Sequence, residues 1–207
     1  KRFGMPQNWW YDGRRDVVAS TKGALDYLTY LNDMFDGDWL HALAAYNSGE
    51  GRVQRAIKAN IRAGKPTDFW NLNLPKETRA YVPKLLALAD ILKNKDEYAY
   101  SWPEVENVAV IEVVDIGSQV DLAFAADLAG MSLKELHALN PGFNRWATSP
   151  DGPHRLVLPL VKAAAFSQAL AKIDQKERLN WVRHTVKSGD SLSKIAKQYH
   201  TTVKVLK

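Results

Sequence analysis

The apolar positions of the first hundred residues recur at the spacing of α-helices. Residues 16–35 place five of them on one face: Ala24, Leu25, Leu28, Leu31 and Phe35. Residues 37–47 and 51–64 show the same period, the first segment behind Asp38 as a helix N-cap and the second ended by Gly64. The pattern therefore predicts a series of amphipathic helices.

A fourth helical pattern covers residues 75–95 and contains Pro83. Proline lacks an amide hydrogen and clashes with the carbonyl one turn earlier, so Pro83 either begins a new segment or bends the helix. Glu77 falls in the first turn of this segment, where the helix dipole favours a negative charge.

After residue 100 the pattern changes from helical spacing to that of a strand. The segment 101–115 contains a β-branched run that suits a strand: Val108, Val110, Ile111, Val113 and Val114. Short helical stretches follow at 120–129 and 132–140, and after a loop rich in turn residues a second strand is predicted at 154–159. These elements predict a βααβ unit.

The C-terminal residues repeat part of this unit. Gly189 is followed by Ile195, Ala196, Thr202 and Leu206, where Gly117 is followed by Ala125, Ala126, Ser132 and Leu136. The spacings agree except that the first copy has two extra residues after its glycine. Repeated spacing of this kind indicates two copies of one supersecondary unit.

The predicted fold class is α+β and mainly helical. We expect a helical domain over 1–100, a βααβ unit over 106–160, a helical spacer over 161–180 and a truncated second copy over 181–207. The boundary between the first two parts is expected near 98–106.

Composition excludes several kinds of site. Apolar residues make up 46% and charged residues 25% of the chain, as in an ordinary globular protein. No apolar run approaches the ~20 residues that cross a bilayer. Cysteine is absent and the five histidines show no metal-ligand spacing, so we expect neither a metal site nor a cofactor.

The net charge of +5 belongs to the C-terminal part of the chain. Residues 172–207 hold nine Lys and Arg against three Asp and Glu. Such a segment is either a solvated basic face or a surface for nucleic acid, anionic lipid or an acidic polymer. Because no nucleic-acid-binding module accompanies it, we expect no nucleic-acid partner.

The stretch ALAAYNSGEGRV, residues 42–53, raises the question of a catalytic acid, because Glu50 stands alone between Gly49 and Gly51. A general acid needs a partly apolar pocket that raises its pKa. Glu50 instead lies at a predicted helix–helix junction, where it suits the N-terminus of the next helix. Tyr46 ends the preceding helix, either packed in the core or facing a ligand.

The C-terminal stretch HTVKSGDSLSKIAKQYHTTVKVLK resembles the opening of a LysM module, a small βααβ domain that binds glycans containing N-acetylglucosamine. The resemblance implies that Gly189, Asp190, Ser191 and Leu192 border a glycan groove; Asp190 also suits a helix N-cap. The first copy resembles a complete but divergent LysM module. It departs from the pattern at Ser118, where Asp is usual, and in its two-residue insertion.

The stretch ALAAYNSGEGRV is similar to the Ala-Tyr-Asn-x-Gly motif of soluble-lytic-transglycosylase (goose-lysozyme-like) domains. ETRAYVPKLLA, residues 77–87, resembles a later motif of that family. With the LysM modules that follow, the chain resembles the membrane-bound lytic murein transglycosylase D type. The resemblance implies that residues 1–100 are the C-terminal part of a lysozyme-like α domain.

The resemblance also implies roles for individual residues. Tyr46, Asn47 and Gly49 would line a peptidoglycan groove, and Tyr81 would contact the substrate or orient the catalytic glutamate. The family takes that glutamate from a Glu-Ser motif on an earlier helix, and neither this motif nor the Gly-Leu-Trp-Gln-type segment after it occurs here. We therefore expect the general acid upstream of Lys1 and no catalytic acid in this chain.

Tryptophan side chains offer faces on which sugars stack. The candidates are Trp9, Trp10, Trp39 and Trp70. Trp39 falls at helical spacing, so it is expected in the core.

The expected function is lytic cleavage of the MurNAc-GlcNAc β-1,4 bond of peptidoglycan, with formation of 1,6-anhydroMurNAc, and glycan binding through LysM. The alternative is a non-catalytic peptidoglycan-binding protein. The resemblance implies a location in the periplasm or cell envelope, associated with the outer membrane. Attachment there would use a lipidated N-terminus outside these residues.

Overall fold

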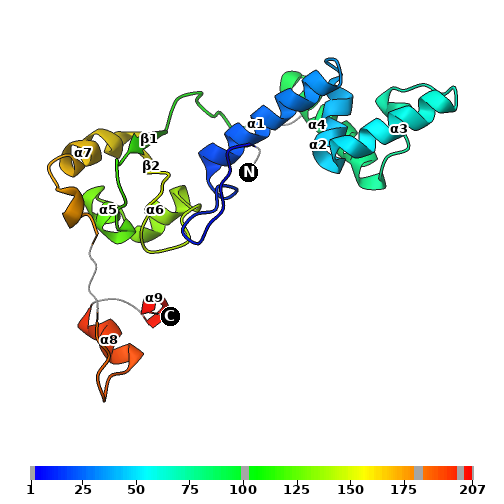
Figure 1. Cartoon of the computed structure of the whole chain (residues 1–207). Helices are drawn as coiled ribbons and strands as arrows, with labels where there is room; N and C mark the ends of the chain where they lie inside the picture. Colours follow the sequence, from blue (N-terminus) through cyan, green and yellow to red (C-terminus); the bar gives the residue numbers. More distant parts are fainter. Residues whose placement is uncertain (1–2, 99–102, 180–183, 200–202, 207) are drawn as a thin grey trace. The chain divides into compact units, whose positions relative to one another are not determined.

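The computed structural model describes residues 3–98, 103–179, 184–199 and 203–206 (Figure 1). Its contacts divide the chain into two compact units, each with its own hydrophobic core. The first unit contains Val18–Asn107 with the residues up to Gly4, and the second contains Met5–Val17 and Val108 onward. Helices dominate, and the described residues hold one two-stranded sheet. The mainly helical α+β class is confirmed.

The first unit follows the predicted helical pattern. Its elements are α1 (Val17–Met34), α2 (Trp39–Ser48), α3 (Glu50–Arg62), the 3-10 helix η1 (Phe69–Asn71) and α4 (Lys76–Lys93). Asp38 is the N-cap of α2, as predicted, because its Oδ1 accepts hydrogen bonds from the N–H groups of Leu40 at 2.8 Å and His41 at 3.0 Å. Helix α4 continues through Pro83.

The core of the first unit joins all four helices and η1. It contains the buried residues Leu31, Phe35, Ala42, Ala44, Ala45, Val53, Phe69, Leu72, Leu74 and Val82. Leu31 and Phe35 belong to the predicted apolar face of α1, whereas Leu25 is 59% exposed. Trp39 was expected in the core but is 53% exposed; it is the first residue of α2, where the alanines of the following turns take the buried face.

The second unit contains the predicted βααβ arrangement. Its elements are β1 (Ile111–Asp115), α5 (Leu122–Leu128), α6 (Leu133–Leu139), β2 (Arg155–Pro159), α7 (Leu160–Leu170) and the 3-10 helix η2 (Gln175–Glu177). The two strands pair antiparallel with Val113 opposite Val157. Helix α7 follows β2 directly and packs into the same core through Ala163, Phe166 and Leu170.

The side chain of Asn140 connects α6 to β2. Its Nδ2 donates to the carbonyl oxygen of Val157 at 2.8 Å, and its Oδ1 accepts from the N–H of Val157 at 2.7 Å. Asn140 is 6% exposed, so these bonds satisfy a buried amide that would otherwise cost free energy.

Residues 5–17 pack against the long loop between α6 and β2. The N–H of Asp12 donates to the carbonyl oxygen of Gly142 at 2.8 Å, and the N–H of Asn144 donates to that of Trp10 at 2.8 Å. A Cβ at Gly142 would lie 2.7 Å from Cε2 of Tyr11. The close approach of the two segments therefore requires glycine at this position.

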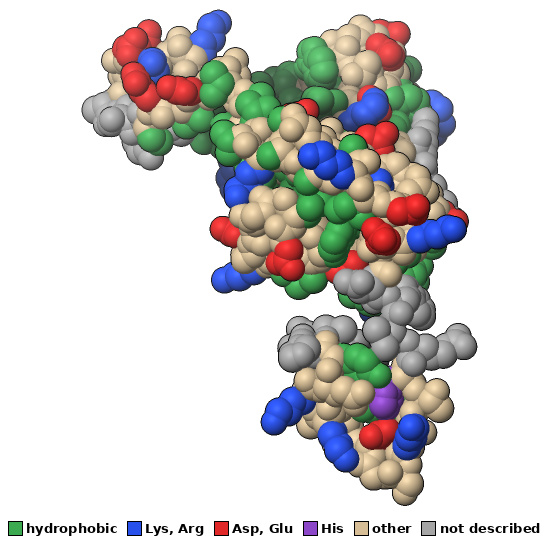
Figure 2. Space-filling model, turned by 90° about the vertical axis from the view of Figure 1, so that its left-hand side faces the viewer, with side chains coloured by type: hydrophobic (Ala, Val, Ile, Leu, Met, Phe, Trp, Pro, Cys, Tyr) green, Lys and Arg blue, Asp and Glu red, His purple; other side chains and the backbone are tan. Residues whose placement is uncertain are grey.

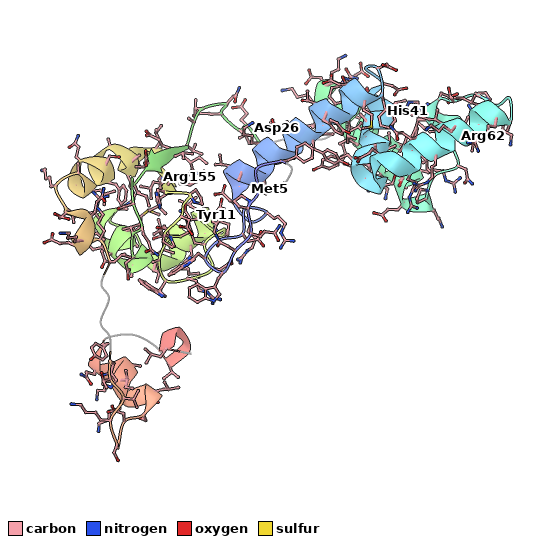
Figure 3. All side chains as sticks on the ribbon, viewed as in Figure 1. Met5, Tyr11, Asp26, His41, Arg62 and Arg155 are labelled. Atoms are coloured by element: carbon pink, nitrogen blue, oxygen red, sulfur yellow. The ribbon has the colours of Figure 1, made fainter. Side chains whose placement is uncertain are left out.

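Asp16 fixes the end of this segment to the sheet. Its Oδ2 accepts from the hydroxyl of Tyr11 at 2.8 Å and from Nη2 of Arg155 at 2.8 Å. Tyr11 and Arg155 lie side by side in Figure 3. Tyr11 is 1% exposed, and burial, followed by the bond to Asp16, raises the pKa of its hydroxyl. The hydroxyl therefore remains a proton donor to Asp16.

Residues 184–199 and 203–206 carry α8 (Leu192–Gln198) and α9 (Val203–Leu206). The repeat found in the sequence has a structural counterpart, because Ile195 and Ala196 are buried at the positions that correspond to Ala125 and Ala126. The glycines that begin the two copies both have positive φ, 65° at Gly117 and 89° at Gly189. Thr202 and the predicted start of this copy at 181 lie outside the described residues.

The second unit is closed by the guanidinium group of Arg178. It donates to the carbonyl oxygens of Ile116 at 2.7 Å, Leu170 at 3.1 Å and Ile173 at 3.1 Å, while the carbonyl of Arg178 accepts from the N–H of Asp121 at 2.9 Å. Charged donors make stronger hydrogen bonds than neutral ones. One side chain thus holds the end of α7 against the turn that follows β1.

Replacing Arg178 with methionine should destabilise the second unit by about 3 kcal/mol, because buried carbonyl groups lose their donors. Urea unfolding followed at the methyl signals of the buried Leu156 measures this change. Lys172→Met, at an exposed position in the same segment, should change the free energy of unfolding by less than ~0.5 kcal/mol. An equal loss in both variants would contradict this account of Arg178.

Candidate functional site

The predicted residues Tyr46, Asn47 and Gly49 lie where α2 ends and α3 begins. Gly49 has φ 90° and ψ 137°, and its N–H donates to the carbonyl oxygen of Ala45 at 2.7 Å. A side chain at this φ would be strained. The glycine therefore allows α3 to start at Glu50, directly after α2 ends at Ser48 and the chain turns at Gly49.

Tyr46 is 38% exposed and stands at the end of a row of aromatic rings. This aromatic row consists of Phe3, Tyr27, Tyr30 and Tyr46. The ring centroid of Tyr27 lies 5.7 Å from that of Tyr46 and 4.9 Å from that of Phe3, and the rings of Tyr27 and Tyr30 stack at 6.3 Å. Tyr46 is thus neither fully packed in the core nor isolated, and a ligand could contact its exposed part.

Sequence reasoning missed the tyrosines of α1. Tyr27 and Tyr30 are three residues apart, a spacing that puts two side chains on one helix face. That spacing was a usable signal for an aromatic surface. Their proximity to Tyr46 depends on tertiary packing, which the spacing alone does not give.

Glu50 begins α3, as predicted for a helix N-terminal residue. Its Oε2 also accepts a hydrogen bond from the hydroxyl of Tyr27 at 2.6 Å. A donor to a carboxylate favours the ionised form, and so does the N-terminus of a helix. Both contacts suit a residue with a structural task, because they tie the start of α3 to α1.

Asn47 is held by α4. The hydroxyl of Thr78, which is 1% exposed, donates to Oδ1 of Asn47 at 2.8 Å. Because the side-chain amide is planar, this bond also sets the direction of its NH2 group. Tyr81 follows Thr78 by three residues on α4, hence on the same side of the helix, and it is half-buried against the core of the first unit.

Gly189, Asp190, Ser191 and Leu192 form the turn that leads into α8. The N-cap of α8 is Ser191, whose Oγ accepts from the N–H of Lys194, so the prediction that Asp190 is the N-cap was wrong. The carboxylate of Asp190 instead binds groups that precede it in the chain, those of His184 and Lys187. Leu192 is 42% exposed.

Asp190 is the centre of a polar network. Its Oδ2 accepts from the N–H of Lys187 at 2.8 Å and lies 2.9 Å from Nε2 of His184. Nδ1 of His184 lies 3.1 Å from the hydroxyl of Tyr199. The Lys187 N–H, and then the imidazole, hold the pKa of Asp190 below its usual range. Figure 2 shows a purple histidine beside a red carboxylate in the lower lobe, with lysines around it.

His184 and Tyr199 were not predicted to have a role. The only signal in the sequence is that the resemblance to a LysM module begins at His184. In the structure His184 contacts both Asp190 and Tyr199, so the two residues support the turn. Among the residues that the structure describes, no group of three or more His, Cys, Asp or Glu could hold a metal ion. No helix in the same described part is long and apolar enough to cross a membrane.

Comparisons with known proteins match three parts of the chain. Residues 1–69 match the transglycosylase SLT domain, residues 110–175 the LysM-like domain of lytic transglycosylase MltD, and residues 184–207 the LysM domain. Membrane-bound lytic murein transglycosylase D of Escherichia coli strain K12 is 43% identical over 216 residues, covering 100% of this chain and 48% of that protein. The protein of the same name from strain O6:H1 gives the same values. The chain thus spans about half the length of the curated relatives it matches.

Thr78→Val should lower the free energy of unfolding of the first unit by about 1 kcal/mol, because Oδ1 of Asn47 loses its buried donor. Urea unfolding followed at the methyl signals of Val82 measures the change. The matched control is Thr29→Val, whose exposed hydroxyl only donates to the carbonyl of Leu25 in its own helix. Comparable losses in the two variants would show that the bond to Asn47 has no special weight.

Acid should destabilise the segment that contains α8. The pKa of Asp190 is lowered in the folded state and returns to about 4 on unfolding. Its carboxylate therefore stabilises the folded segment fully above that value, and the stabilisation disappears as the pH falls through the lowered pKa. The ring signals of Tyr199, followed by NMR between about pH 6 and 2, report this loss. In Asp190→Asn the segment should be weaker at pH 6 and should lack this pH dependence; an unchanged profile would contradict the assignment.

Proposed function

We propose, from the confirmed resemblance to the membrane-bound lytic murein transglycosylase D type along the whole chain, that this protein acts in the lytic cleavage of peptidoglycan. The reaction would break the MurNAc-GlcNAc β-1,4 bond and form a 1,6-anhydroMurNAc end. The observation that carries this proposal is the α2–α3 junction, where the Ala-Tyr-Asn-x-Gly motif is built around Gly49 with Tyr46 partly exposed.

The residues at this junction suit a sugar ligand. The exposed part of Tyr46 offers an apolar face on which a sugar ring can stack, with Tyr27 behind it at 5.7 Å. Asn47 presents an amide that can bond to the acetamido group of an N-acetylated sugar. Thr78 holds this amide in place, so little side-chain entropy remains to be lost when a ligand binds.

The general acid of the reaction is expected from outside residues 1–207. Cleavage of a glycosidic bond needs a carboxylic acid that protonates the leaving oxygen. Glu50 is engaged by Tyr27 and by the start of α3, which supports a structural task for it. Tyr81, on the same side of α4 as Thr78, would orient the incoming glutamate or contact the substrate.

Glycan binding is proposed for the C-terminal LysM segment. Gly189, Asp190, Ser191 and Leu192 would border the groove. The bonds of Asp190 to Lys187 and His184 keep the backbone of this turn in one conformation. The exposed Leu192 supplies an apolar contact. The lysines around the segment suit a polymer that carries carboxylates on its peptide stems.

The partner would be the glycan strand of the cell wall, built from GlcNAc and MurNAc. The protein would accordingly work in the periplasm, associated with the outer membrane through a lipidated N-terminus outside these residues. The alternative function is non-catalytic binding of peptidoglycan. The same LysM contacts support this alternative, and it differs from the first proposal only in the cleavage step.

The test incubates purified cell-wall sacculi with this chain, scores the pelleted protein, and searches the supernatant by mass spectrometry for 1,6-anhydro-muropeptides. Residues 1–207 should bind without releasing anhydro products. Leu192→Asp should weaken binding at least severalfold, because it places a negative charge against an acidic polymer. Glu112→Gln, an exposed change on β1, serves as the control.

Two results would overturn these assignments. Anhydro products that disappear in Glu50→Gln would make Glu50 the acid. A chain that does not bind sacculi at all would contradict the peptidoglycan partner. The same assay on the longer protein that contains these residues separates the two functions: an enzyme releases anhydro products, whereas a binding protein only pellets.

A further inference from the structure

In the first LysM-like module, the stretch that corresponds to Gly189–Leu192 forms hydrogen bonds with a loop of the same module. In the second copy this stretch runs from Gly189 to Leu192; in the first it runs from Gly117 to Leu122 and includes the two inserted residues. The N–H of Val120 donates to Oγ1 of Thr148 at 3.0 Å, and the N–H of Thr148 donates to the carbonyl oxygen of Val120 at 2.9 Å. Thr148 is fully buried. Both backbone groups of Val120 are therefore occupied by the loop between α6 and β2, and the same loop binds the N–H of Leu122 through the carbonyl oxygen of Trp146 at 2.8 Å.

The same loop also carries the exposed Arg145 and the half-buried Trp146. Residues 5–17 bring Trp9 and Trp10 to the same place. The ring centroids of Trp9 and Trp10 lie 4.7 Å apart at 90°, and those of Trp10 and Trp146 lie 6.0 Å apart. Three tryptophans from two distant segments thus meet next to one arginine.

This tryptophan cluster is held rigidly by backbone bonds. Oδ1 of Asn8 accepts from the N–H groups of Trp10 at 2.9 Å and Tyr11 at 2.8 Å. The carbonyl oxygen of Trp10 accepts from the N–H of Asn144, and that of Trp9 accepts from Nε of Arg145 at 3.2 Å. A ligand that binds here therefore does not have to order the backbone that carries the two tryptophans.

Trp9 is nevertheless 57% exposed. Its indole is a large apolar surface, and leaving so much of it in water forgoes the stabilisation that burial would give. The same segment does bury an aromatic ring, because Tyr11, two residues later, is only 1% exposed. Exposure of a fixed tryptophan, rather than a mobile one, is the arrangement expected of a ring on which another flat group stacks.

Arg145 gives this surface its charge. Its guanidinium carbon lies 4.0 Å from the centre of the Trp9 ring, an attractive cation–π geometry. Arg15 donates to Oδ1 of Asn144 close by. Within the described residues neither arginine is joined to a carboxylate by an ion pair, whereas Arg14 is paired with Asp12 at 2.7 Å. A ligand with a carboxylate would complement the two remaining charges.

We propose that Trp9, Trp10 and Arg145 form a second glycan-binding site, which takes an amino sugar that bears a carboxylate, with the sugar against the part of Trp9 that Arg145 leaves exposed and the acid on the arginine. The proposal rests on the peptidoglycan function given above, in which such units alternate with neutral ones. In this proposal the first LysM-like module binds glycan through the loop between α6 and β2, and not through the stretch from Gly117 to Leu122.

The test is an NMR titration of the full chain, because it observes this site separately from the C-terminal LysM segment. Indole N–H signals are assigned with Trp9→Phe and Trp10→Phe. The two probes are a soluble muropeptide, which carries acidic groups, and a neutral chitooligosaccharide of similar length. The muropeptide should shift the Trp9 and Trp10 signals, and the neutral probe should do so at least tenfold more weakly.

Arg145→Met should raise the Kd of the muropeptide at these signals about tenfold and leave the weak effect of the neutral probe unchanged. Trp9→Ala, read at the Trp10 signal, should raise the Kd of the muropeptide to a similar extent. Trp9→Phe, which keeps an aromatic ring, should raise it less. Arg62→Met and Val161→Ala, at exposed positions of α3 and α7, are the matched controls and should change nothing.

Three outcomes would overturn the proposal. The first is a muropeptide that leaves both indole signals in place while the chain still binds sacculi; the proposed function then stands and this site fails. The second is equal binding of the two probes, or no effect of Arg145→Met, which refutes recognition of the acid. The third is a chain that binds no sacculi and no probe, which removes the proposed function together with this site.

Discussion

The second unit depends on one buried carboxylate, that of Asp16. An ionised group that leaves water needs partners, because unpaired burial costs several kcal/mol. The partners of Asp16 include the hydroxyl of Tyr11 and the guanidinium group of Arg155. Tyr11 belongs to the same short segment, and Arg155 begins β2. The carboxylate therefore ties residues 5–17 to the sheet. The ring of Tyr11 also contacts that of Phe143, with the two centroids 5.2 Å apart, so the same residue joins this segment to the loop after α6.

Because of this contact, the end points of the sequence match differ from those of the structural unit. The transglycosylase SLT match covers residues 1–69, yet residues 5–17 of that match share the core of the LysM-like module. Gly142 shows how far the two segments have adapted to each other, since any side chain there would collide with Tyr11. Residues 5–17 therefore match the transglycosylase SLT domain in sequence but pack in the second unit.

The sequence predicted what is encoded locally. The helical period and the capping residues predicted α1 to α4, and the strand pattern with the repeated spacing predicted the βααβ unit. Contacts between distant segments were not predictable in this way: the bond from Tyr27 to Glu50, the support of Asn47 by Thr78, and the packing of Trp10 beside Trp146. Asp190 was assigned to the wrong helix position because Asp and Ser are equally good N-caps, and only the structure shows which of the two neighbours takes the role.

The α2–α3 junction illustrates how a site can be set before its ligand or acid arrives. Its aromatic ring is backed from α1 by Tyr27, and its amide is oriented from α4 by Thr78, so two helices distant in sequence fix two adjacent residues. Catalysis gains most from polar groups that need no reorganisation during the reaction. Under the proposed function, the general acid would meet a junction in which the Tyr46 ring and the Asn47 amide are already held in place.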